Sequence, residues 1–205
     1  MSRLPWSVGF LLLGAFSISS LGHAAELRDG DIIFQDSQSS QSRAIKAATH
    51  SPYSHVGLIF LKDGTPFVAE AVQPVTLTPL ASWIARGRDG RYVVKRLKDA
   101  ELATDLRKKL RKETIKYLGK DYDWQFAWSD REIYCSELVW KVYARSLGIE
   151  LCPLKTLKEF DLSQPVVRKT LEQRYGQAIP LSEPVVAPSD IFQSPHLATV
   201  ENQTL

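Results

Sequence analysis

The stretch from His55 to Val72 reads HVGLIFLKDGTPFVAEAV, and it decides the fold. Two apolar runs rich in branched residues, at 56–61 and 66–72, lie on either side of Asp63-Gly64. Because Asp-Gly between two such runs is a strong hairpin signal, the stretch predicts two antiparallel strands. A loop of two residues and a loop of four residues both place His55 and Glu70 on one side of the sheet. An odd loop or a β-bulge would separate them.

Glu70 is the charged residue of an otherwise apolar run. A carboxylate in such surroundings costs free energy unless it has a partner, so we expect a cation or a hydrogen-bond donor beside it. The other interpretation is a solvated side chain on an exposed face of the strand.

Cys135 precedes a second decisive segment, SELVWKVYARSL at 136–147, which predicts a helix stopped by Gly148. The dipole and the free backbone amides at a helix start favour a thiolate, and the same amides can hold an oxyanion. A nucleophilic cysteine and a buried structural cysteine both fit this position.

A nucleophilic cysteine needs a base and a group that orients the base. The chain has four histidines. His23 lies in an N-terminal segment that we expect to be removed, His196 lies in the Pro-rich tail, and capping explains His50 at a helix end. His55 begins a strand, which holds a side chain rigidly. It is therefore the candidate base, with Glu70 as the orienting carboxylate.

Cys152 is the other cysteine of the chain, and a disulfide with Cys135 is one interpretation. The predicted helix between them would hold its ends about 18 Å apart at 1.5 Å per residue. A disulfide needs Cα atoms within about 7 Å, so the sequence favours two free thiols.

The N-terminus has the pattern of a secretory signal peptide, with Arg3, a short apolar run at 8–16 and the small residues of Gly22-His23-Ala24. We expect residues 1–24 to be cleaved, which predicts a periplasmic or otherwise exported protein. Residues 25–205 then form a single catalytic domain. No later segment approaches the roughly 18 apolar residues of a membrane span.

Composition excludes several function classes. The formal net charge of +3 gives no case for a nucleic-acid partner. The histidines are too widely spaced for a metal cluster, and the chain has no phosphate loop, dinucleotide fingerprint or Gly-x-Ser-x-Gly elbow. The sequence predicts neither a cofactor nor a metal, and it leaves the oligomeric state open.

Further elements follow from local patterns. We expect strands at 31–34 and 92–97, a helix at 42–49 with the small residues Ala44, Ala47 and Ala48 on one face, and a helix at 100–118 capped by Gly119. The aromatic segment 122–128 fits a loop that covers the core or one wall of a substrate groove. The Pro-rich residues 165–195 predict an irregular wrap over the core, with a short strand at 185–186.

Taken together, these segments resemble the YiiX-type permuted papain-like amidases, which belong with the NlpC-type cysteine peptidases and the lecithin–retinol acyltransferase relatives. The matching segments are GDIIF at 30–34, ATHSPYSHVG at 48–57, EAV at 70–72, GKDYD at 119–123, YCSELVW at 134–140 and LKEFD at 157–161. The resemblance implies an α+β, circularly permuted papain-like fold, with a small antiparallel sheet packed against helices. In the permuted fold, the strand that carries the base comes before the helix that carries the nucleophile in the chain.

By this resemblance Cys135 is the nucleophile, His55 the base and Glu70 the orienting residue. Tyr53 and Tyr134 flank them, and either hydroxyl could assist an oxyanion hole. The implied activity is hydrolysis of amide or ester bonds in cell-wall peptides or lipid-like acyl substrates. Two alternatives stay open: an acyltransferase with the same Cys/His pair, and a non-catalytic periplasmic protein that binds lipids or peptides.

Overall fold

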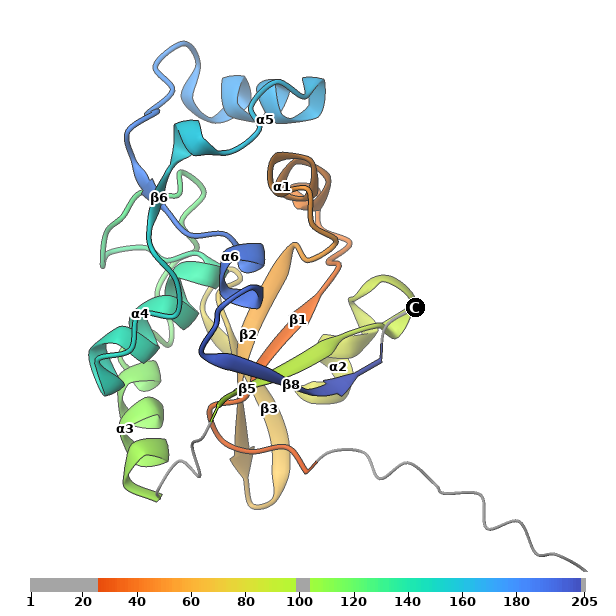
Figure 1. Cartoon of the computed structure of the whole chain (residues 1–205), viewed down its shortest axis with the longest axis vertical. Coiled ribbons are helices and arrows are strands. Elements are labelled where there is room, and N and C mark those ends of the chain that lie inside the picture. Colours follow the sequence, from red (N-terminus) through yellow and green to blue (C-terminus); the bar gives the residue numbers. More distant parts are fainter. Residues whose placement is uncertain (1–25, 99–103, 204–205) are drawn as a thin grey trace, which may run out of the picture.

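The structure is a computed structural model that describes residues 26–98 and 104–203 (Figure 1). The predicted signal peptide, residues 1–24, lies outside the described residues, as do the first residues of the helix predicted at 100–118. In the described part of the chain, no helix is both long enough and apolar enough to cross a membrane.

The predicted hairpin is present as β2 (His55–Lys62) and β3 (Thr65–Glu70). Its loop is the two-residue alternative, because Lys62 pairs with Thr65. Asp63 and Gly64 have φ of 51° and 78°, the left-handed pair that a tight hairpin turn requires. The even loop keeps His55 and Glu70 on one side of the sheet, as the sequence predicted.

The hairpin forms the middle of a six-stranded antiparallel sheet with the order β4-β3-β2-β1-β5-β8. The other strands are β1 (Ile32–Gln35), β4 (Thr76–Pro79), β5 (Val93–Leu97) and β8 (Leu197–Asn202). Both β1 and β5 match the sequence prediction within one residue at each end. The sequence had not indicated β4 or β8, the two edge strands.

Residues of the central strands alternate between two cores, as a sheet covered on both faces requires. Ile32, Val56 and Leu58 belong to the larger core, beneath α4 (Cys135–Leu147) and α3 (Thr104–Ile115). Ile33 and Ile59 belong to the smaller core on the opposite face, around Trp83 of α2 (Leu80–Ala85). The 3-10 turn η1 (Arg88–Gly90) follows α2.

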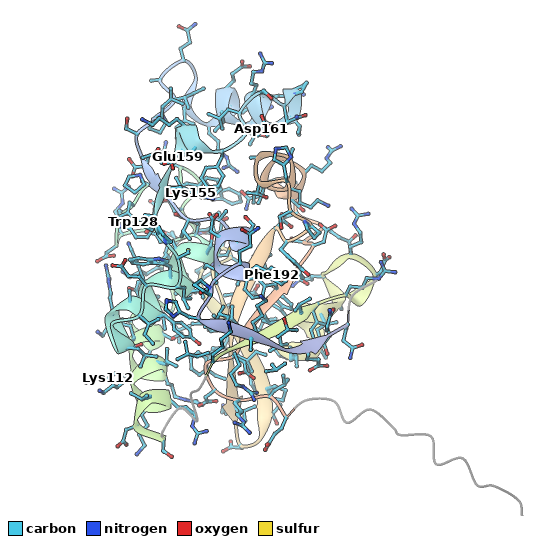
Figure 2. All side chains as sticks on the ribbon, viewed as in Figure 1. Lys112, Trp128, Lys155, Glu159, Asp161 and Phe192 are labelled. Carbon is cyan, nitrogen blue, oxygen red and sulfur yellow. The ribbon has the colours of Figure 1, made fainter. Side chains whose placement is uncertain are left out.

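A second group of elements lies beyond one end of the sheet (Figure 1). There α1 (Ser42–Thr49) packs against α5 (Pro165–Tyr175). The same region holds η2 (Leu157–Glu159) and the two-stranded sheet of β6 (Lys155–Thr156) and β7 (Pro184–Val185), with α6 (Pro188–Phe192) leading back to β8. Figure 2 shows Lys155, Glu159 and Asp161 in this region, at the opposite end of the molecule from Lys112 of α3.

The prediction for residues 165–195 was wrong in its main point, because this segment contains two helices. Pro165 and Pro188 stand at the starts of α5 and α6, where the missing N–H costs nothing and the fixed φ suits a helix. The predicted strand at 185–186 is present as the short β7.

The predicted C-cap of the helix at 100–118 was also wrong. The helix ends at Ile115, and a series of turns follows it. Gly119 (φ 81°) belongs to those turns, and its N–H donates to the carbonyl of Val75.

Candidate active site

Glu70, at the end of β3, is fully buried and fully partnered. Its Oε2 lies 2.7 Å from Nε2 of His55. Its Oε1 accepts hydrogen bonds from Thr78 Oγ1, at 2.5 Å, and from the guanidinium of Arg86. Burial opposes ionisation of Glu70, but the hydrogen bonds from His55 and Thr78 and the charge of Arg86 bring its pKa below the usual value. Glu70 therefore has the partners that a carboxylate in an apolar strand needs. The other interpretation, a solvated side chain on an exposed face, is wrong.

His55, the first residue of β2, links this carboxylate to the thiol. Its Nε2 faces Glu70, and the Cys135 side chain is also close enough to act on the ring. The ring stacks on the Trp83 indole, with centroids 5.8 Å apart. Burial alone would lower the pKa of His55, but the hydrogen bonds and charges of Cys135 and Glu70 outweigh it and raise the pKa to about 9. The imidazole is thus protonated at neutral pH and can donate a proton.

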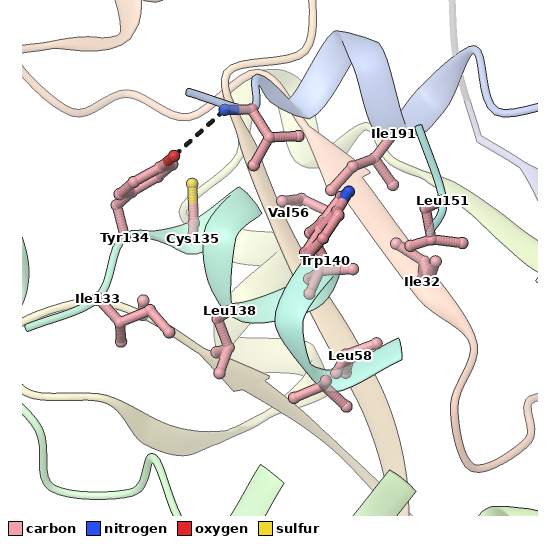
Figure 3. Close-up of a cluster of buried hydrophobic side chains, with 14 of the residues drawn as sticks. Ile32, Val56, Leu58, Ile133, Tyr134, Cys135, Leu138, Trp140, Leu151 and Ile191 are labelled. Carbon is pink, nitrogen blue, oxygen red and sulfur yellow. Dashed lines mark hydrogen bonds between the residues drawn. The ribbon is translucent and has the colours of Figure 1, made fainter. Parts of the chain in front are cut away.

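Cys135 is the first residue of α4, and only 4% of it is exposed. Figure 3 shows its sulfur at the start of the helix, above the buried core side chains. The first hydrogen bond of the helix runs from the amide of Leu138 to the carbonyl of Tyr134. The amides of residues 135–137 precede that bond, so they have no acceptor within the helix and are available to an oxyanion.

Tyr122 contributes a hydroxyl near the thiol that the sequence did not single out. The Nε2 of Gln41 donates to this hydroxyl at 2.8 Å, so the tyrosine proton is free to be donated elsewhere. Burial and the nearby charge of Cys135 raise the pKa of Tyr122 far above its usual value, which keeps the proton on the oxygen. Tyr122 is therefore a hydrogen-bond donor beside the thiol.

Two hollows lie beside the candidate site, one lined by Cys135 and the other by His55. The first, here called the Cys135 cavity, encloses about 700 Å³ of empty space, part of it open to solvent. It lies between the start of α4, the helices α1 and α5, and the segments that follow η2 and β7. Its walls are mainly apolar and include Ala44, Ala48, Phe160, Leu162, Val167 and Leu171.

The second hollow, here called the His55 groove, has a more polar lining. His55 lines it together with Ser37, Gln38, Gln73, Arg86 and Trp124. Gln41 and Tyr122 line both hollows, so the two are neighbours with these side chains between them. The thiol opens into an apolar space and the imidazole into one of mixed, more polar lining.

The aromatic segment 122–128 serves both of the purposes considered from the sequence. Tyr122 and Phe126 line the Cys135 cavity, and the half-exposed Trp124 lines the His55 groove. Trp128 instead packs against Trp140 of α4, with ring centroids 5.3 Å apart, and so covers the core.

The other polar residues that the sequence analysis considered, His50, Tyr53 and Tyr134, have partners other than Cys135 and His55. His50 has φ of 50° at the end of α1, which agrees with a capping role, and its Nε2 lies 3.1 Å from Oδ2 of Asp161. Tyr53 stacks on Phe192 at 4.1 Å. The hydroxyl of Tyr134 accepts the amide proton of Val186 at 3.2 Å (Figure 3), so it also fixes the wall of the Cys135 cavity.

Cys152 is free and buried, as is Cys135, so the predicted absence of a disulfide is confirmed. Burial raises the pKa of the Cys152 thiol to about 12. Such a thiol is protonated at neutral pH and unreactive.

A scan of protein families gives one model that matches residues 26–201, described as "Permuted papain-like amidase enzyme, YaeF/YiiX, C92 family". The chain belongs to this family. The YaeF/YiiX family has the permuted papain-like fold, and its members are cysteine hydrolases of the amidase type. The order of the site residues in this chain, with His55 and Glu70 before Cys135, is the permuted order.

Two relatives of the YaeF/YiiX family are similar over most of the chain. The uncharacterized protein YiiX of Escherichia coli (strain K12) is 48% identical over 193 residues, which cover 94% of this chain and 95% of that protein. The crystal structure of a protein named metalloprotein yiiX, from Escherichia coli O157:H7, is 49% identical and superposes with a TM-score of 0.86. That match covers 88% of this chain and 99% of the other.

The charge of His55 predicts a pH-dependent stability. Its pKa rises from 6.5 to about 9 on folding, so the protonated ring stabilises the fold fully below pH 6.5, and this contribution is lost as the pH rises through about 9. We expect wild type to exceed His55→Gln in free energy of unfolding by an amount that shrinks on the order of 3 kcal/mol across this range. Urea unfolding of both proteins at each pH measures it. A difference that stays constant with pH would show that His55 is not charged in the folded protein.

Proposed function

We propose that this chain is an exported cysteine hydrolase that removes an apolar acyl group from an amide or ester, with Cys135 as nucleophile, His55 as acid and base, and Glu70 as the group that orients His55. The observation that carries the proposal is the division of space around the pair. The thiol opens into the apolar Cys135 cavity and the imidazole into the more polar His55 groove. In acyl transfer the nucleophile keeps the acyl group, and the imidazolium protonates the leaving group. The acyl chain therefore belongs in the cavity and the leaving amine or alcohol in the groove.

The proposed reaction has two steps. The Cys135 thiolate attacks the carbonyl carbon, and the amides at the start of α4 hold the oxyanion, with the Tyr122 hydroxyl as a further donor. The bond to the leaving nitrogen or oxygen breaks as His55 gives that atom its proton, which leaves a thioester on Cys135. His55 then takes a proton from water, the hydroxide attacks the thioester, and the carboxylic acid departs as the thiolate forms again.

No metal enters this reaction. One related protein is named a metalloprotein. Within residues 26–98 and 104–203 of this chain, no group of three or more His, Cys, Asp or Glu side chains is placed to hold a metal ion. The residues that the structure describes do not fit a resident metal, so no step is assigned to one.

The export in this proposal is supported by the signal-peptide pattern of residues 1–24. The apolar cavity favours lipid-like acyl substrates over cell-wall peptides, whose acyl side is polar. An acyltransferase would use the same first step and pass the acyl group to an amine or alcohol in place of water. Adding such an acceptor and measuring acyl product against free acid separates these two activities.

A matched pair of substitutions in α1 tests the assignment of the cavity. Ala48 lines the Cys135 cavity, whereas its neighbour Ala47 does not. For wild type we expect kcat/KM on p-nitrophenyl acyl esters to rise about fourfold per added methylene, at about 0.8 kcal/mol each, until the cavity is full. Ala48→Leu should shorten the preferred chain by two or more carbons, an order-of-magnitude estimate from the added side-chain volume. Ala47→Leu should keep the wild-type preference.

The chain-length profile can also contradict the assignment. A wild-type kcat/KM that does not depend on chain length would mean that the acyl group does not enter the cavity. The same conclusion would follow if Ala47→Leu and Ala48→Leu changed the profile equally.

A further inference from the structure

Arg174, in the last turn of α5, brings a positive charge to the wall of the Cys135 cavity. Its Nη2 donates to Oε1 of Gln41 at 2.6 Å, and its guanidinium lies 4.5 Å from the centroid of the Phe126 ring. Among the residues that the structure describes, no carboxylate lies within 4 Å of it. A half-buried cation therefore faces a mainly apolar space with one hydrogen bond and one aromatic contact.

Comparable arginines elsewhere in the fold have carboxylate partners. Arg86 pairs with Glu70 and Arg96 pairs with Asp31. A guanidinium has five N–H donors, and Gln41 uses one of those of Arg174. Burial lowers the pKa of Arg174, which is the electrostatic cost of holding the charge there. Asp123 is the carboxylate whose charge acts on Arg174, but it makes no ion pair with it. The unused donors, with no carboxylate in direct contact among the described residues, suit an anion that arrives with the substrate.

The position of Arg174 places that anion close to the reacting bond. Gln41 accepts a hydrogen bond from Arg174 and donates one to the Tyr122 hydroxyl. Tyr122 lies beside Cys135, and Gln41 and Tyr122 also line the His55 groove. One side chain, that of Gln41, thus separates Arg174 from the His55 groove, in which the proposed function places the leaving group.

We propose that Arg174 binds an anionic group, a carboxylate or a phosphate, that the substrate carries within a few bonds of the scissile carbonyl. The substrate would then be an acyl amide or ester with an apolar chain in the Cys135 cavity and a negative charge at its rim. This inference rests on the proposed function and specifies the substrate of the same site.

Matched substrates with the same acyl chain, one with an anionic group and one without, test the inference. N-lauroylglycine is compared with N-lauroylglycinamide, and N-lauroylphosphoethanolamine with N-lauroylethanolamine. Wild type should prefer the anionic member of at least one pair, and the pair with the larger preference identifies carboxylate or phosphate. In Arg174→Gln the ratio of kcat/KM for the charged over the neutral member should fall about ten- to a hundredfold, whereas Arg174→Lys should keep part of it.

Arg168→Gln is the matched control, because Arg168 lies on α5, is exposed, and bonds only the backbone carbonyl of Ser163 among the described residues. It should keep the wild-type ratio. An equal loss on both members of a pair in Arg174→Gln would overturn the proposal, because it would mean that Arg174 only supports Gln41 and Tyr122. A wild-type preference for the neutral members would also overturn it.

Binding to Cys135→Ala protein separates this inference from the proposed function. Calorimetry with the same pairs measures the preference for the anion without turnover. The inference is supported if the anionic member binds more tightly and this preference is lost when Arg174→Gln is added. That holds even if the wild-type protein hydrolyses none of the substrates. Equal binding of both members overturns it even if hydrolysis is found.

Discussion

Replacing Cys135 by alanine is expected to lower turnover of acyl substrates by at least about 10³-fold, because no other group at the site can form the thioester. The loss should appear in kcat at saturating substrate, with the thermal unfolding temperature close to that of wild type. The measurement is release of p-nitrophenol from an acyl ester, with the circular dichroism melting curve of the same sample.

Cys152→Ala is the matched control for this variant. Cys152 is a buried free thiol whose pKa is raised to about 12, and the bond from Trp140 goes to its backbone carbonyl, not to its sulfur. Its loss should leave turnover within about threefold of wild type, an order-of-magnitude allowance for small changes in packing. Brief treatment with iodoacetamide at neutral pH should label Cys135 and spare Cys152. Full activity of Cys135→Ala would rule out the thioester route.

Glu70→Gln is expected to lower kcat on the order of 10²–10⁴-fold. The amide removes the negative charge that holds the proton on His55, and it no longer fixes the orientation of the ring. It also leaves the Arg86 guanidinium without its carboxylate. The pKa of His55 should fall, so the imidazolium becomes less populated at neutral pH. The dependence of the iodoacetamide reaction rate on pH measures this change directly.

Asp31→Asn separates that chemical effect from loss of stability. Asp31 is almost fully buried and receives two hydrogen bonds from Arg96, so it forms a carboxylate–arginine pair of the same kind just before β1. It lies outside both hollows. We expect Asp31→Asn to lower the unfolding temperature without the loss of kcat. If both variants lost kcat in proportion to stability, Glu70 would have only a structural role.

The site residues that could be predicted from the sequence share a property: local patterns fix where their side chains go. The two-residue loop decides the side of the sheet for His55 and Glu70, and the helix start decides the surroundings of Cys135. Each follows from a few neighbouring residues and the periodicity of one element. The separation of Cys135 from Cys152 likewise followed from the length of one helix.

The residues that sequence analysis missed are brought to the site by contacts between distant segments. Arg86 reaches Glu70 from the end of α2, a helix with no clear pattern of its own, and Thr78 reaches it from the edge strand β4. Arg174 lies 133 positions from Gln41 in the sequence. No local pattern reports such a neighbour, and the proline at the start of α5 disguised the helix that carries Arg174.

The placement of the two hollows on either side of Tyr122 has a kinetic consequence. On the proposed assignment, the amine or alcohol can leave through the His55 groove while the acyl chain still fills the Cys135 cavity. Water then enters by the space that the first product has vacated. The two products would depart in a fixed order, with the polar one first, and the acyl-enzyme between them would be an intermediate that outlasts the first departure.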